Sequence, residues 1–233
     1  AGQSCNAGSC RGFMWNASEG IEELSPPEES ENVSPYLASS DKAVIAGNSC
    51  SATRCLAVVW TGAGTGEVLL LPGHVHSFVN FLSTDGSIVL GQSCGPSGNC
   101  HAFMWTASAG MVEMILPGDT QSAPWFLVSD GSRVFGQSCL SGCRVFVWTA
   151  ASGIAEVILP GDVLSYATYS SPDGLHLQGQ SCDANYSNCR AFHWTPASGV
   201  EELLLPGDTH SSVWLHSSDG STAAGVSCGP IGC

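Results

Sequence analysis

The chain has 233 residues, of which 20 are Asp or Glu and only 6 are Lys or Arg, so its formal net charge is −14. This charge repels nucleic acid and anionic membranes, and we expect neither as a partner. No run approaches 18 apolar residues, so we expect no membrane insertion. Because residue 1 is Ala rather than Met, we expect either a mature chain after removal of a signal peptide or a fragment of a longer protein.

The sequence begins inside a repeating pattern. Residues 2–5 (Gly-Gln-Ser-Cys) match the end of a second strand, and a third and a fourth strand follow within residues 1–31. Gly-Gln-Ser-Cys, a Phe/Val-x-Trp triplet, Leu-Pro-Gly and Asp-Gly then recur about every 45 residues. The tryptophans of the triplets are Trp15, Trp60, Trp105, Trp148 and Trp194. Such self-similarity is typical of a repeat architecture in which each repeat packs on the next.

Each complete repeat is predicted to form four short strands, as the repeat that contains Trp148 illustrates. Strands are expected over 124–128, 133–138, 144–148 and 154–159, where apolar runs are separated by turn signals. Asp130-Gly131 predicts a two-residue hairpin turn with positive φ at both residues. The Pro-Gly-Asp segment after the fourth strand is the longest connection, and it leads into the next repeat.

The sequence ends with a first and a second strand, within residues 209–233. This half-repeat would complete the half-repeat at 1–31, so we predict an all-β, five-bladed β-propeller of four-stranded repeats, with 1–233 as a single domain. An open, linear stack of the same repeats is the alternative. The segments 2–5 and 225–228 occupy the same second-strand place, so one end must be displaced or must pair with another molecule.

Twelve cysteines form six close pairs along the sequence. The pairs are Cys5/Cys10, Cys50/Cys55, Cys94/Cys100, Cys139/Cys143, Cys182/Cys189 and Cys228/Cys233. Zinc sites need a spacing that lets four ligands meet tetrahedrally, whereas the spacing here varies and no Cys-x-x-Cys occurs. We therefore expect six local disulfides and no metal, in a secreted or cell-surface protein.

Together these markers resemble the HAF-type extracellular repeat family, named for a His-Ala-Phe triplet. His101-Ala102-Phe103 matches the triplet and Arg190-Ala191-Phe192 nearly does, with the Trp-Thr strand, the Leu-Pro-Gly segment and the Asp-Gly turn in register. The resemblance covers nearly the whole chain and implies a secreted or cell-surface, propeller-like array with no assigned chemistry. The cysteine pair in every repeat departs from the family pattern.

Two variable positions are candidate contact sites, because function is expected where the repeats differ. Five residues before the turn Asp, three repeats carry an aromatic residue, which either stacks on a sugar ring or a neighbouring molecule or fills the core. After the second cysteine, four repeats carry a basic residue, which either binds an anionic glycan or an acidic partner or makes a local cross-strand pair. The candidates are Tyr36, Trp125 and Trp214, and Arg11, His101, Arg144 and Arg190.

No catalytic constellation stands out, so we expect no enzyme and no cofactor. Acidic residues recur at equivalent places, whereas a glycosidase needs two carboxylates that face one bond. His74 and His76 flank Val75, but no third metal ligand can be named. Sequons predict possible glycosylation at Asn16, Asn32 and Asn185, all in predicted turns or loops.

These features predict a non-enzymatic structural scaffold that assembles with copies of itself in an extracellular fibre or surface layer. An unused strand edge is a template for pairing with another chain, and the duplicated second strand leaves one such edge. The alternative is a glycan-binding, lectin-like propeller in which Trp125 and Trp214 carry binding.

Overall fold

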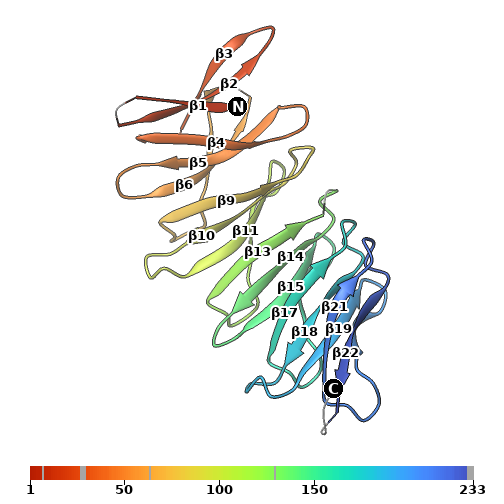
Figure 1. The fold of residues 1–233 in the computed structure, drawn as a ribbon. Coiled ribbons are helices and arrows are strands. Elements are labelled where there is room, and N and C mark those ends of the chain that lie inside the picture. The colour runs from red at the N-terminus through yellow and green to blue at the C-terminus, as the bar shows by residue number, and fades with distance from the viewer. Residues whose placement is uncertain (7, 27–29, 63, 129, 230–233) are drawn as a thin grey trace. The chain divides into compact units, whose positions relative to one another are not determined.

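A computed structural model of the chain describes residues 1–6, 8–26, 30–62, 64–128 and 130–229. Every regular element in these ranges is a strand (Figure 1), which confirms the all-β prediction. The described part of the chain contains no helix that is long and apolar enough to cross a membrane.

The strands recur in four kinds, and we name each repeat by its tryptophan. First strands are β4 (Asn32–Ala38), β9 (His76–Leu82), β13 (Gln121–Leu127), β17 (Leu164–Ser170) and β21 (His210–His216). Second strands are β1 (Gly2–Cys5), β5 (Val44–Cys50), β10 (Val89–Cys94), β14 (Val134–Cys139), β18 (Leu177–Cys182) and β22 (Ala223–Cys228). Third strands are β2 (Cys10–Asn16), β6 (Cys55–Thr61), β11 (Cys100–Thr106), β15 (Cys143–Thr149) and β19 (Cys189–Thr195). Fourth strands are β3 (Gly20–Ser25), β8 (Glu67–Leu69), β12 (Gly110–Met114), β16 (Gly153–Val157) and β20 (Gly199–Leu203), and β7 (Gly64–Thr65) is an additional short strand.

The chain divides into two compact units, one of residues 1–115 and 120–131, the other of residues 116–119 and 132–233. In the first, β9 to β12 form a four-stranded sheet, and the Trp15 and Trp60 repeats share an eight-stranded sheet in which β1 pairs with β2. In the second, β14, β15 and β16 are neighbours in that order, β17 to β20 form a four-stranded sheet, and β21 pairs with β22. Repeated four-stranded sheets are therefore confirmed, whereas five blades and the pairing of 209–233 with 1–31 stay predictions.

The first strands β4, β9, β17 and β21 each carry a β-bulge opposite the glycine of the second strand. In the Trp105 repeat, Val79 pairs with Gly91 and Phe81 with Leu90, so Asn80 is the extra residue. A Cβ atom at Gly91 would lie 2.2 Å from the carbonyl oxygen of Phe78, so only glycine fits there. The equivalent bulge residues of other repeats are Tyr36, Thr168 and Trp214.

The Asp-Gly hairpins differ from the predicted two-residue turn. In the Trp105 repeat φ is positive at Gly86 (75°), whereas Asp85 is not among the described residues with positive φ. Asp85 Oδ1 instead accepts hydrogen bonds from the Ser83 hydroxyl (2.7 Å) and the Ser87 amide (2.9 Å). The prediction of positive φ at both residues was wrong, because the flanking serines make a longer loop around the aspartate.

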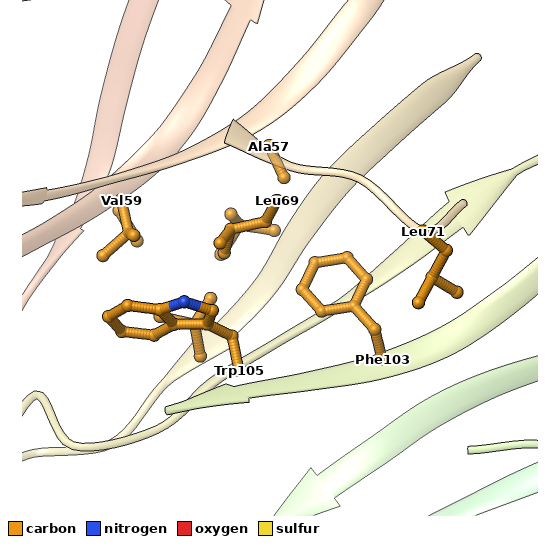
Figure 2. Packing of buried hydrophobic residues seen from close by; sticks show 9 residues of the cluster. Ala57, Val59, Leu69, Leu71, Phe103 and Trp105 are labelled. Carbon is orange, nitrogen blue, oxygen red and sulfur yellow. The ribbon is translucent and has the colours of Figure 1, made fainter. Parts of the chain in front are cut away.

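The buried core is built between consecutive repeats. In the first compact unit, Phe103 and Trp105 of β11 pack against side chains of the preceding repeat (Figure 2). The Trp105 indole N–H also donates to Glu67 Oε1 of that repeat at 3.2 Å. The side chains that Phe103 and Trp105 cover include Ala46, Ala57, Val59, Leu69 and Leu71.

In the Trp105, Trp148 and Trp194 repeats, two buried serines add hydrogen bonds to the preceding repeat. The Ser122 hydroxyl accepts from the Ala102 amide at 2.7 Å, and the Ser138 hydroxyl accepts from the Leu116 amide at 3.0 Å. The Leu159 amide likewise donates to the Ser181 hydroxyl at 3.0 Å instead of to a strand neighbour. This bond explains why β16 ends at Val157, two residues before the predicted end of the strand.

Candidate functional site

Five of the six predicted disulfides are confirmed. They are Cys5–Cys10, Cys50–Cys55, Cys94–Cys100, Cys139–Cys143 and Cys182–Cys189. Each joins the end of a second strand to the start of a third strand, and Cys228 is also disulfide-bonded. The predicted partner of Cys228, Cys233, lies outside the described residues. Five hairpin disulfides indicate an oxidising environment.

The four candidate basic residues pair with acidic residues of the fourth strand in their own repeats. The pairs are Arg11–Glu23 (3.3 Å), Arg144–Glu156 (2.6 Å), Arg190–Glu202 (2.6 Å) and His101–Glu113. The structure therefore shows the local cross-strand pairing that was one of the two sequence interpretations. Contact of these residues with a ligand or partner stays a prediction.

Arg144 and Arg190 each bind a second, buried carboxylate from the preceding repeat. Arg144 Nη2 lies 2.9 Å from Asp119 Oδ1, and Arg190 Nη2 lies 2.9 Å from Asp162 Oδ1. Burial lowers the pKa of Arg190, but hydrogen bonds and charges of Asp162 and Glu202 outweigh it, so the net shift is upward. Each guanidinium thus bridges two repeats. Sequence reasoning missed these contacts because Arg144 lies 25 residues from Asp119, and Arg190 lies 28 residues from Asp162.

The histidines of the Trp105 repeat have separate partners. His74 Nδ1 lies 3.0 Å from the Ser93 hydroxyl, and His76 Nδ1 lies 3.4 Å from the Cys55 amide. Across the described ranges, no three His, Cys, Asp or Glu side chains are grouped so that they could hold a metal ion.

Two of the candidate aromatic residues, Tyr36 and Trp214, are bulge residues, whereas Trp125 is placed only within β13. Tyr36 is 49% exposed and donates its hydroxyl to the Val79 carbonyl at 2.7 Å, and its partial burial raises its pKa. Trp125 is half-buried in β13, and Trp214 is exposed at the bulge of β21. A bulge redirects the side chain of its extra residue, which the alternating pattern of a strand does not reveal. Glycan or partner contact at these three residues stays a prediction.

Two of the three candidate glycosylation sites are not in loops. Asn16 is the last residue of β2 and Asn32 is the first residue of β4, so only Asn185 lies in a loop, between β18 and β19. The loop prediction was wrong for Asn16 and Asn32 because the strands extend further than the turn signals indicate.

A pocket of about 550 Å³ lies on the Trp194 repeat and on β21 and β22. We call its Gln178, Ala191, His193, Leu203 and Leu205 the pocket face. By repeat position these five residues correspond to Ala46, Ala57, Val59, Leu69 and Leu71, which Phe103 and Trp105 cover. Leu71 is 6% exposed, whereas Leu205 is 64% exposed. The pocket therefore lies on the Trp194 repeat at the place where Phe103 and Trp105 pack on the Trp60 repeat.

Two polar residues distinguish the pocket face from its equivalents. The buried Gln178 donates from Nε2 to the Gly220 carbonyl at 3.1 Å, and its Oε1 has no hydrogen-bond partner among the described residues. His193 Nε2 lies 2.9 Å from His176 Nδ1. Burial lowers the pKa of His193, and the charge of His176 lowers it further. The signal that sequence reasoning missed is this polar pair at positions that are apolar in the Trp60, Trp105 and Trp148 repeats.

No family model and no curated protein matches the chain, so the resemblance to the HAF-type family stays a prediction. The fold is similar to dipeptidyl peptidase 4 of Porphyromonas gingivalis, with a TM-score of 0.52 and 11% identity over 90% of this chain and 39% of that chain. It also matches a putative TolB of Agrobacterium tumefaciens, with a TM-score of 0.45 and 13% identity over 86% of this chain and 75% of that chain. TolB of Acinetobacter baumannii matches with a TM-score of 0.42 and 18% identity over 91% of this chain, which spans 52% of that protein. At such identities the likeness concerns the fold alone, which is a β-propeller-like series of repeated sheets.

Proposed function

We propose that this chain is a secreted, non-enzymatic structural scaffold whose copies associate head to tail. The observation that carries the proposal is the exposed pocket face, whose equivalent in the Trp60 repeat is covered by Phe103 and Trp105 of the next repeat. The five disulfides support a secreted location, because such bonds persist in oxidising compartments.

The occupant that fits the pocket face is the Trp15 repeat of a second copy. Phe13 and Trp15 hold the same motif positions in β2 as Phe103 and Trp105 hold in β11. Trp15 is 59% exposed, and Ile21 on the neighbouring strand is also exposed. Phe13, Trp15 and Ile21 form what we call the leading face. Within the chain, Phe103 and Trp105 pack on the repeat before them. The same contact between the leading face of one copy and the pocket face of another gives a head-to-tail series of copies.

Docking by this geometry requires a change at β1. In the Trp105 repeat, Gly91 of the second strand pairs with Phe103 of the third, and in the Trp15 repeat Gly2 pairs with Phe13. The β22 strand of a second copy would pair with the same edge of β2 and would displace β1. Three of the four β1 residues are exposed, so its release uncovers little surface, and strand addition replaces the lost backbone hydrogen bonds. The five blades predicted from the sequence would then be completed between copies.

Light scattering over a concentration series, with negative-stain microscopy, tests this association. We expect the unmodified chain to form concentration-dependent chains of copies. Leu205→Asp blocks the pocket face and Trp15→Ser blocks the leading face, so either variant alone should stay monomeric. The control is Leu140→Asp, because Leu140 is equally exposed (62%) but lies outside both faces. It should assemble like the unmodified chain.

A mixture of the two blocked variants gives the sharpest test. Each variant keeps one intact face, so an equimolar mixture should form dimers and nothing longer. A strictly monomeric unmodified chain, or assembly of both blocked variants, would overturn the proposal. A monomer that binds a glycan array through Trp214, with binding lost in Trp214→Ala, would favour the lectin-like alternative.

A further inference from the structure

Two equivalent pockets lie at successive repeats of the second compact unit. The first acidic pocket, of about 260 Å³, is lined by Asp119, Arg144, Glu156 and Asp162 together with apolar residues. The second acidic pocket, of about 380 Å³, is lined by Asp162, Asp183, Arg190 and Asp208, among others. Asp162 lines both pockets. Each pocket therefore surrounds one guanidinium group with three carboxyl groups.

Both pockets contain a buried carboxylate oxygen that lacks a donor. The side chains of Asp119 and Asp162 are only 3% and 5% exposed. One oxygen of each accepts from an arginine, but Oδ2 of each is buried without a hydrogen-bond partner among the described residues. Burying such an oxygen unpaired is unfavourable, and native structures seldom leave it so. Its recurrence in two successive repeats indicates a built feature.

The neighbouring groups do not supply the missing donor. Arg144 directs Nη1 to Glu156 at 2.6 Å and Nη2 to Asp119 Oδ1 at 2.9 Å. In the second pocket, hydrogen bonds from Ser187 and Asn188 lower the pKa of Asp183, which keeps that carboxylate charged. A positively charged ligand with N–H donors would supply the donors that both pockets lack, and the net charge of −14 would attract it.

The equivalent place in the first compact unit has different chemistry. His74 takes the position of Asp119, and His101 takes the position of Arg144, with the two ring centres 4.9 Å apart. The paired acidic pockets are thus a property of the Trp148 and Trp194 repeats rather than of the repeat pattern as a whole.

We propose that the two acidic pockets bind primary ammonium groups of a linear, multiply charged ligand. An ammonium group has three N–H donors, so one group can donate to Asp119 Oδ2 and to a neighbouring carboxylate. Because Asp162 lines both pockets, two ammonium groups of one ligand can occupy them together. A free polyamine and a lysine-rich peptide segment share this chemistry. The proposal does not depend on self-association, because the pocket face contains none of these carboxylates.

Calorimetric titration of the full chain with spermidine and, separately, with a tetralysine peptide tests the proposal. Saturable binding of either probe is expected, and the probe that binds more tightly identifies the source of the ammonium groups. Spermidine acetylated on both terminal amines, which lacks the two primary ammonium groups, should not bind. Asp162→Asn should weaken binding at least about tenfold, because hydrogen bonds to charged groups are strong. Asp85→Asn, in an exposed turn outside both pockets, is the matched control and should bind normally.

Amide chemical shifts of the unmodified chain give a second measurement that does not depend on the stability of the variants. Spermidine or tetralysine should shift the amides of Gly142 in the first pocket and Thr209 in the second. Shifts spread evenly over the acidic surface, equal binding of acetylated spermidine, no saturable binding of either probe, or unchanged affinity in a folded Asp162→Asn variant would overturn the proposal.

Discussion

Replacing Phe103 with Ala removes a side chain that joins the Trp105 repeat to the repeat before it. Phe103 is fully buried in the cluster with Leu69 and Leu71. A buried Phe→Ala change lowers the free energy of unfolding by about 3–5 kcal/mol, since transfer energy is lost and a cavity remains. We expect the upper half of that range. The ring lies against Gly91, whose backbone is held by pairing on both sides and cannot collapse into the cavity.

Urea denaturation monitored by tryptophan fluorescence measures this loss. The matched control is Phe13→Ala, at the same motif position in the Trp15 repeat, where the ring is only half-buried. That variant should lose less than about 2 kcal/mol, because less apolar surface leaves water there on folding. The account of the core is refuted if Phe103→Ala lowers the free energy of unfolding by less than about 1 kcal/mol, or by no more than Phe13→Ala.

Two further measurements concern the polar contacts of the repeats. Ser122→Ala leaves the buried Ala102 amide without its acceptor at 2.7 Å, so the free energy of unfolding should fall by about 1–3 kcal/mol, and an unchanged value would contradict the bond. Hydrogen bonds to the Asp85 carboxylate, chiefly from Ser83 and also from Ser87, lower its pKa from 3.8 to about 2, which an NMR titration should measure. Because the folded pKa is the lower one, this stabilisation is present above the ordinary pKa and is lost as the pH falls through about 2. Ser87→Ala should raise the Asp85 pKa, and a value near 3.8 in the unmodified chain would show that these bonds do not form.

Much of the strand layout can be predicted from the sequence, because it depends on local spacing. The Cys139/Cys143 pair and the Phe146-x-Trp148 triplet mark the hairpin and the strand that follow one another along the chain. The Asp-Gly turns were predicted as hairpins but not in their form, because at Asp85 the carboxylate accepts hydrogen bonds from the Ser83 hydroxyl and the Ser87 amide.

The candidate site was less predictable, because its contacts join separate repeats. The ion pair of Arg144 with Asp119, the hydrogen bond of Ser122 to Ala102 and the empty place on the pocket face all depend on how one repeat lies against the next. A serine or an aspartate at a fixed position in a repeat does not reveal its partner 20 or 25 residues away. Gln178 and His193 carry a readable signal, since they are polar where other repeats are apolar.

The placement of the disulfides determines how this chain would respond to tension. The five described disulfides enclose sequence separations of 4 to 7 residues, and each lies within a single hairpin. Pulling on the ends would separate one repeat from the next, since the described bridges do not cross that boundary. A fully extended repeat would reach roughly 150 Å, and the loop closed by its disulfide would shorten that length by only about 15–25 Å. Under such a load, each described disulfide would keep its own hairpin loop closed while the contacts between repeats are lost.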